Sequence, residues 1–178
     1  MIRLFAAVAV PPEVGEELTE RMHGLPGARW RTLEQLHVTL RFYGDIQEDR
    51  AADLDGELAR IACPPLELAL TGVGSFGDLH QRAALWAGVE ENAALRALAT
   101  RCESAAKRAG LKPETRSYKP HVTLAYLRGA ERDKVGAWLG KHGLLRTAPF
   151  RVTWFGLYSS VLHPDGGRYQ LEREYPLL

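Results

Sequence analysis

The tetrapeptide His-Val-Thr-Leu occurs twice in this chain, at residues 37–40 and at residues 121–124. The chain contains six histidines and nine threonines, so a match to His-x-Thr-apolar would arise by chance only about 0.1 times. Two identical copies, 84 residues apart, therefore indicate a duplicated structural unit.

The residue types of this motif suit proton transfer. Because an imidazole has a pKa of about 6.5, two histidines can hold opposite protonation states near neutral pH. One then accepts a proton from a nucleophile while the other donates one to a leaving group. A threonine two residues along a strand projects its hydroxyl on the same side and can contact an oxygen on which charge builds. The motifs predict acid–base catalysis on a phosphodiester, with His37 and His121 as catalytic residues and Thr39 and Thr123 as phosphate contacts.

Two other uses of these residues stay open. Threonine is favoured in strands, so the pairs could simply lie on a solvated sheet surface. The histidines could also be two ligands of a metal, although no cluster of Asp, Glu or Cys stands beside them at metal-ligand spacing. Asp45, the nearest acidic residue after the first motif, follows in a turn. We therefore predict neither a metal nor a cofactor.

The segment 36–43 alternates between apolar and polar residues, which is typical of a half-buried strand. Arg41 shares the predicted polar face with His37 and Thr39 and is our candidate for a cationic phosphate contact, in addition to the two threonines. A solvated charge is the alternative. Phe42 falls on the apolar face, where packing in the core is favoured over stacking on a base. The other aromatic candidates for stacking are Trp86, for which core packing is also favoured, Trp154 and Tyr158.

The elements around the motifs repeat in order. Strands are predicted at residues 2–10, 29–33, 36–43, 66–73, 83–89, 119–128, 150–159 and 168–175. Helices are predicted around residues 14–22, 51–61, 95–109 and 135–139. A glycine-rich loop is predicted around residues 72–77, and a hairpin turn at residues 164–167. Strand, helix, motif strand and helix succeed one another in residues 2–61 and again in residues 83–142. Each half is too small to bury much core alone, so we expect the two to pack together.

The composition is that of an ordinary globular protein. The chain has 178 residues, of which 46% are hydrophobic and 25% charged, with a net charge of +1. A non-specific, whole-surface nucleic-acid binder would be more basic. Cys63 and Cys102 are predicted to pack in the core, since two cysteines make no disulfide framework. No apolar run is long enough to span a membrane, so we expect a cytoplasmic protein with no membrane association.

Several segments together resemble one protein family. They are residues 3–8, residues 36–44, residues 85–89, residues 119–125, and the closing segment with Arg168-Tyr169 and residues 175–177. In these segments the chain resembles the two-histidine phosphoesterases, and within them the RNA 2′,3′-cyclic phosphodiesterases once called 2′-5′ RNA ligases. The resemblance covers nearly the whole chain.

The resemblance implies an α+β fold in which residues 1–178 form a single bilobal domain, with two pseudo-symmetric antiparallel sheet-plus-helix lobes around a central cleft. It implies hydrolysis of an RNA-terminal 2′,3′-cyclic phosphate, or of a nucleoside 2′,3′-cyclic phosphate, to a 2′-phosphate, and a weak, reversible 2′-5′ joining of RNA ends in vitro. His37 would be the acid for the leaving 3′ oxygen and His121 the base for water. We expect a monomer that needs no protein partner.

One position departs from the family pattern. Many relatives carry an arginine two residues after the leucine of the second motif, where this chain has Tyr126. In an ideal strand that residue would face the apolar side. The arginine that would make this phosphate or backbone contact is absent here. Tyr126, Lys119 and Arg128 are further candidates for substrate binding, with solvated charge as the alternative for the last two.

Two other functions fit the same residues. The first is hydrolysis of a different cyclic or 2′-5′ phosphoester by an enzyme of the same fold. The second is a non-catalytic module that binds RNA ends. Intact motifs in both halves argue against a pure binding module, because binding alone does not require two titratable imidazoles.

Overall fold

The computed structural model describes residues 1–164 and 166–178. The strands are β1 (Ile2–Ala9), β2 (Ala28–Trp30), β3 (His37–Ile46), β4 (Leu66–Leu68), β5 (Leu70–Asp78), β6 (Arg82–Val89), β7 (His121–Leu127), β8 (Phe150–Val152), β9 (Trp154–His163) and β10 (Gly166–Pro176). The α-helices are α1 (Pro12–Thr19), α2 (Glu48–Leu58), α3 (Ala93–Arg108) and α4 (Arg132–His142). A 3₁₀ turn, Leu33–Gln35, precedes β3. The predicted α+β class and the order of elements are confirmed.

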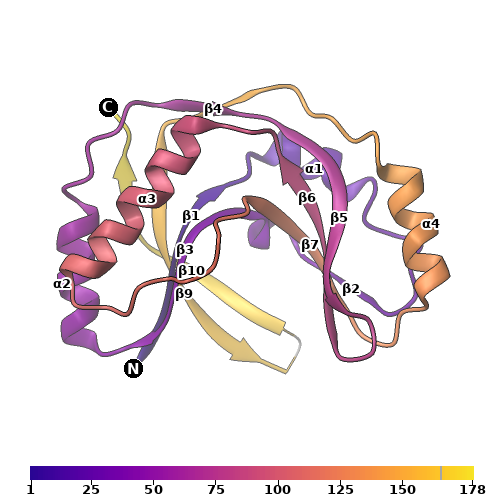
Figure 1. Ribbon diagram of the computed structural model, residues 1–178, viewed down its shortest axis with the longest axis horizontal. Helices are drawn as coiled ribbons and strands as arrows, with labels where there is room; N and C mark the ends of the chain where they lie inside the picture. The colour runs from indigo at the N-terminus through magenta and orange to yellow at the C-terminus, as the bar shows by residue number, and fades with distance from the viewer. Residues whose placement is uncertain (165) are drawn as a thin grey trace.

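An antiparallel sheet of eight strands forms the centre of the molecule, in the order β10-β9-β1-β3-β7-β6-β5, with β2 added beside β7. Its two halves meet where β3 pairs with β7, and the register there is Val38 opposite Val122. β10, β9, β1 and β3 form one half, whereas β7, β6, β5 and β2 form the other. Figure 1 shows α2 and α3 beside the first half and α4 beside the second. The prediction that residues 1–178 form a single domain stays a prediction.

Two predicted strands are each divided between two sheets. Segment 66–73 splits into β4 and β5, and segment 150–159 splits into β8 and β9. β4 and β8 pair with each other in a separate two-stranded sheet, while β5 and β9 belong to the large one. The alternation of side chains continues through the crossover residues Ala69 and Thr153, so the sequence pattern alone does not show the change of partner.

The predicted glycine-rich loop is wrong, because its glycines lie within β5. Gly74 pairs with Trp86 on β6, and the indole ring lies directly over the glycine. A Cβ at this position would stand 2.2 Å from the ring. The glycine is therefore required by close packing within the sheet and does not mark a turn. Of the predicted hairpin turn 164–167, Asp165 lies outside the described residues.

The helices and one face of the sheet enclose the main core. Asn92 caps α3 by accepting a hydrogen bond from the Leu95 N–H at 2.9 Å, and the apolar stripe of this helix is buried. Both cysteines are buried and free, as predicted. On the opposite face, a small cluster of Phe5, Ala7 and Tyr158 packs against Tyr169. No helix in the described ranges is long and apolar enough to cross a membrane.

Candidate active site

The two motifs meet at the centre of the sheet. Val38 and Val122 oppose each other in the β3–β7 pair, and both are fully buried on the helix side. Because side chains alternate along a strand, their neighbours point to the other face. That face carries the four polar residues of the motifs: His37, Thr39, His121 and Thr123. The antiparallel register places each histidine toward the threonine of the other motif.

A β-bulge follows the threonine in the first motif. Ala7 of β1 pairs with Thr39, and the next residue, Ala6, pairs with Arg41. Between these two pairs the chain moves on by two residues in β3 but by one in β1. The alternation of side chains between the two faces therefore inverts after Leu40. Leu40 is buried in the core, and Arg41 points toward α3.

The second motif has a bulge at the equivalent leucine. Trp86 of β6 pairs with Thr123, and the next residue, Leu85, pairs with Ala125. Ala125 is fully buried, as Leu124 is. The duplication thus includes the bulge as well as the tetrapeptide, and each bulge turns the residue five positions after the histidine toward the site face.

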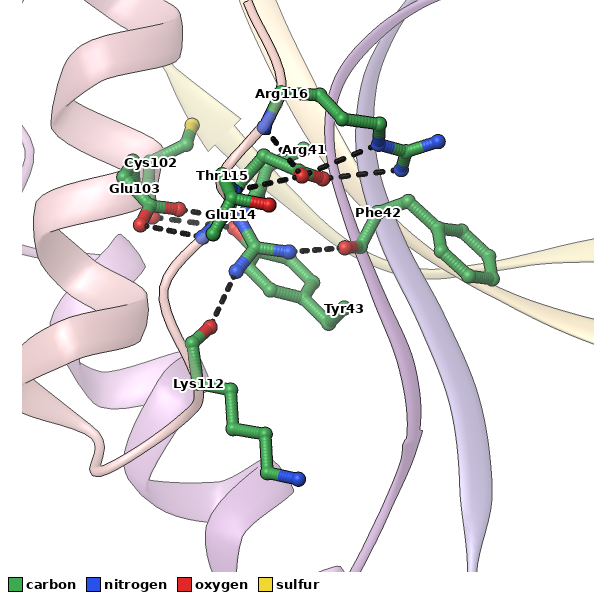
Figure 2. Close-up of polar contacts among 9 residues, drawn as sticks. All are labelled: Arg41, Phe42, Tyr43, Cys102, Glu103, Lys112, Glu114, Thr115 and Arg116. Carbon is green, nitrogen blue, oxygen red and sulfur yellow. Dashed lines mark hydrogen bonds and ion pairs between the residues drawn. The ribbon is translucent and has the colours of Figure 1, made fainter.

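Arg41 lies on the helix face, so its predicted position beside His37 and Thr39 is wrong. Figure 2 shows the guanidinium directed to α3, where Nε donates to Glu103. Its other donors bond the carbonyl oxygens of Phe42 and, at 2.7 Å, Lys112. The bulge is the physical reason, because it moves Arg41 to the face opposite that of Thr39.

The same inversion exposes two aromatic residues. Phe42 is 45% exposed and pairs with Phe5, a member of the cluster on the site face. The prediction that Phe42 packs in the core is therefore wrong. Tyr126 is 48% exposed and pairs with Ala84, so the predicted apolar face is wrong for this residue as well.

His37 lies in an aromatic pocket and is only 8% exposed. Its ring centroid is 4.6 Å from that of Tyr158, 5.5 Å from that of Tyr169 and 5.8 Å from that of Phe5. Burial lowers the pKa of His37 to about 4, because the cation loses its hydration. A hydrogen bond with the backbone of Gln35 acts in the opposite direction, and the charge of Arg31 lowers the pKa further.

His121 has a more open environment. Its Nδ1 lies 2.6 Å from the carbonyl oxygen of Lys119, which only accepts, so Nδ1 carries a hydrogen and Nε2 is directed elsewhere. Phe76 contacts the imidazole edge to face at 4.9 Å, and the ring of Trp86 lies at 6.3 Å. Lys119 thus contributes its backbone to the site, while its side chain is exposed.

Trp86 lies on the site face, opposite Thr123, so the favoured core position is wrong for it. Its indole Nε1 is buried without a hydrogen-bond partner among the described residues. Tyr158, another aromatic candidate, is the ring nearest to His37. Trp154 pairs with Pro176 at the start of β9, and within the described ranges its ring contacts neither motif histidine.

Arg31 is a residue that the sequence did not single out. It follows β2, and its backbone N–H donates to the carbonyl of Leu124 at 2.8 Å. Its guanidinium lies 5.1 Å from the ring centre of Tyr126 and 5.4 Å from that of Tyr169. Nη2 also donates to the Tyr169 hydroxyl at 2.9 Å. The sequence feature that could have pointed to Arg31 is its position directly after Trp30, which packs toward the core on Trp138.

Arg128 is exposed just beyond β7, where its backbone N–H bonds the carbonyl of Gly27 at 2.9 Å. Within residues 1–164 and 166–178, no three His, Cys, Asp or Glu side chains gather closely enough to hold a metal ion. The groups that this face offers include two imidazoles, the hydroxyls of two threonines, aromatic rings and Arg31.

Comparison with known proteins assigns the family. The sequence model of the 2′-5′ RNA ligase superfamily matches residues 10–163. The chain belongs to this superfamily. Its sequence is 27% identical to an RNA 2′,3′-cyclic phosphodiesterase of Archaeoglobus fulgidus, over 95% of this chain and 97% of the relative. It is 31% identical to an RNA 2′,3′-cyclic phosphodiesterase of Aeropyrum pernix, over 77% and 79%.

A solved structure agrees with the sequence relatives. Escherichia coli LigT in complex with 3′-AMP superimposes with a TM-score of 0.80 at 26% identity, over 99% of this chain and 98% of that one. The predicted two-histidine phosphoesterase fold is thereby confirmed for this member of the superfamily.

Proposed function

We propose that this protein hydrolyses the 2′,3′-cyclic phosphate at the end of an RNA, or of a nucleoside, to a 2′-phosphate. The observation that carries the proposal is the Val38–Val122 pairing, which places two His-x-Thr units on one face of the sheet. The names of its superfamily relatives support the choice of substrate.

The reaction divides between the two histidines. A water molecule attacks phosphorus and gives its proton to His121, whose Nε2 is the free acceptor because Nδ1 bonds the Lys119 carbonyl. The bond from phosphorus to the 3′ oxygen breaks, and that oxygen takes a proton from His37. Thr39 and Thr123 donate hydrogen bonds to the non-bridging oxygens as their charge increases.

The buried position of His37 suits the acid role once substrate is bound. In the free protein its pKa of about 4 keeps the ring neutral at pH 7. The phosphodiester anion is a counter-charge that raises this pKa and allows His37 to hold a proton. A cation in such poorly hydrated surroundings is a strong proton donor.

All of these groups come from one chain, so the proposed reaction requires no second copy, and its two proton transfers require no metal ion. Joining of an RNA end through a 2′-5′ bond would use the same groups in the same roles, with a 5′-hydroxyl in place of water as the nucleophile. Phe42 and Tyr126, both exposed on the site face, are proposed contacts for a base or ribose. Lys119 and Arg128 are proposed as peripheral contacts to an RNA backbone.

The test is incubation of the purified protein with adenosine 2′,3′-cyclic phosphate in EDTA, followed by chromatography of the products. We expect adenosine 2′-phosphate at an undiminished rate. A rate that EDTA abolishes and an added divalent cation restores would contradict the metal-free mechanism. A 3′-phosphate product would contradict the proposed leaving group.

A further inference from the structure

Arg31 is a nearly buried cation that has no carboxylate partner among residues 1–164 and 166–178. The residue as a whole is only 8% exposed. Within the described ranges its polar partner is the neutral hydroxyl of Tyr169, and its remaining contacts are the faces of two tyrosine rings. Arg41, which is also largely buried, is instead paired with Glu103. A buried guanidinium is ordinarily neutralised by an anion, because desolvation of an isolated charge is costly.

The position of Arg31 places this charge between the two halves of the site. Its backbone is bonded to β7 at Leu124, in the second motif. Its side chain reaches Tyr169 on β10, whose ring contacts His37 at 5.5 Å. The charge therefore lies on the same face as the motif histidines, and it contributes to the lowered pKa of His37.

The donor geometry leaves room for an anion. Arginine presents five N–H donors in a planar fork that matches two oxygens of a phosphate. One hydrogen bond, from Nη2 to Tyr169, holds the fork in place. The ring of Tyr126 supports the guanidinium at 5.1 Å, which fixes the plane without neutralising the charge.

We propose that Arg31 binds the substrate phosphate, and that the phosphate is the missing counter-ion of this buried guanidinium. The proposal rests on the proposed function for the identity of the ligand. It assigns the phosphate-binding cation to the residue directly after β2, in place of Arg41. The tyrosines at positions 126 and 169 position the fork, one by its ring face and the other by its hydroxyl.

The test compares two charge deletions, one at the residue directly after β2 and one within β2. Arg31→Met removes the buried cation, whereas Arg29→Met removes an exposed one two residues earlier on the same side of β2. The affinity of each variant for adenosine 2′-phosphate and for adenosine is measured by calorimetry. We expect Arg31→Met to weaken the phosphate ligand on the order of 10- to 100-fold and to leave adenosine unchanged. Arg29→Met should stay within about twofold for both ligands.

Moving the charge distinguishes binding from a purely structural role. In an Arg31→Met background, Tyr126→Arg places a guanidinium on the site face directly below the lost one. We expect this second substitution to recover most of the affinity for adenosine 2′-phosphate. Equal losses in Arg31→Met and Arg29→Met, or equal losses for adenosine and its phosphate, would overturn the proposal.

A further variant covers the case in which Arg31→Met does not fold. Arg31→Lys keeps the charge but loses the fork, and we expect it to fold and to bind adenosine 2′-phosphate several-fold more weakly. Wild-type affinity in this variant would contradict two-point recognition. If the wild-type protein binds the phosphate through Arg31 but hydrolyses no cyclic phosphate, the proposed function fails while the assignment of Arg31 stands. If it hydrolyses the substrate and Arg31→Met is equally active, only the Arg31 proposal fails.

Discussion

The two halves of the sheet have the same local arrangement around their motif histidines. In each half the motif strand has a bulge at its leucine. The motif threonine pairs with a residue of the neighbouring strand, and that residue pairs in turn with a glycine of the next strand. Two residues after that glycine an aromatic ring contacts the histidine. The ring is Tyr158 for His37, at 4.6 Å, and Phe76 for His121, at 4.9 Å.

The surroundings of the two histidines differ. β10 adds Tyr169 and β1 adds Phe5 around His37, whereas β5 is the edge strand beside His121. Burial therefore favours the neutral form of His37, while His121 is more exposed and oriented by a carbonyl. The packing around His37, and not the motif that it shares with His121, therefore lowers its proton affinity.

The largest expected effect is the loss of either imidazole. We predict that His37→Ala and His121→Ala each lower kcat for adenosine 2′,3′-cyclic phosphate on the order of 10²-fold or more. The double variant should be little worse than the poorer single one, because the pair acts as a unit. His80→Ala, at an exposed histidine, is the matched control. A mild effect of either motif substitution would remove that histidine from proton transfer.

A substrate with sulfur in place of the leaving oxygen distinguishes the catalytic acid from the catalytic base. In an adenosine 2′,3′-cyclic phosphate with sulfur at the 3′ bridging position, the leaving thiolate needs no proton, because a thiol is far more acidic than an alcohol. We predict that His37→Ala loses less than about tenfold on this substrate, while His121→Ala keeps its full defect. Rescue of His121→Ala instead would exchange the two roles.

The threonines should show smaller and more symmetric effects. Thr39→Ala and Thr123→Ala each remove one proposed hydrogen bond to the phosphate, and we predict losses on the order of 10- to 10³-fold in kcat. Serine at either position should recover most of the rate, because the hydroxyl is retained. Thr100→Ala, on α3, serves as control. Wild-type rates in either alanine variant would place that threonine outside the site.

The pH dependence probes the aromatic pocket. Since His37 stays neutral down to a pKa of about 4, the acidic limb of kcat/KM should lie well below pH 6.5, whichever histidine is the acid. Tyr158→Ala opens the pocket, so the pKa of His37 should rise toward 6.5 and the limb should move to higher pH. Phe76→Ala, the equivalent change beside His121, should leave this limb in place. Equal shifts in the two variants would argue against burial as the cause.

The smallest effect on activity is expected at Arg41. Glu103→Ala leaves this largely buried guanidinium without its carboxylate, and we predict a loss of about 3 kcal/mol in the free energy of unfolding. Affinity for adenosine 2′-phosphate should change less than about twofold, because Arg41 faces the helices. Urea unfolding and calorimetry measure the two quantities. A weaker affinity with unchanged stability would return Arg41 to the phosphate site.

The sequence predicted what depends on periodicity. Hydrophobic alternation located both motif strands, and the threonine spacing identified the four residues that the structure gathers at the β3–β7 pairing. The predictions failed where a one-residue change in strand register decides on which face of the sheet a side chain lies. A bulge at Leu40 moved Arg41 to the core side and Phe42 to the site, and the bulge at Leu124 did the same for Ala125 and Tyr126.

A bulge has no signature in these two segments, since each is a continuous run of strand-forming residues without glycine or proline at the insertion. The position of Arg31 was hidden for a related reason. Its position depends on β2 pairing beside the second motif, which is a contact between segments more than 90 residues apart. Local patterns do not determine such pairings.

The most direct test of the account is a single-turnover reaction of an RNA ending in a 2′,3′-cyclic phosphate, in EDTA and ¹⁸O-labelled water, with mass analysis of the product. The account predicts a terminal 2′-phosphate that carries one ¹⁸O atom, formed by the wild-type protein and lost in both His37→Ala and His121→Ala. Formation of the labelled product by either variant at the wild-type rate would contradict catalysis by the paired motifs.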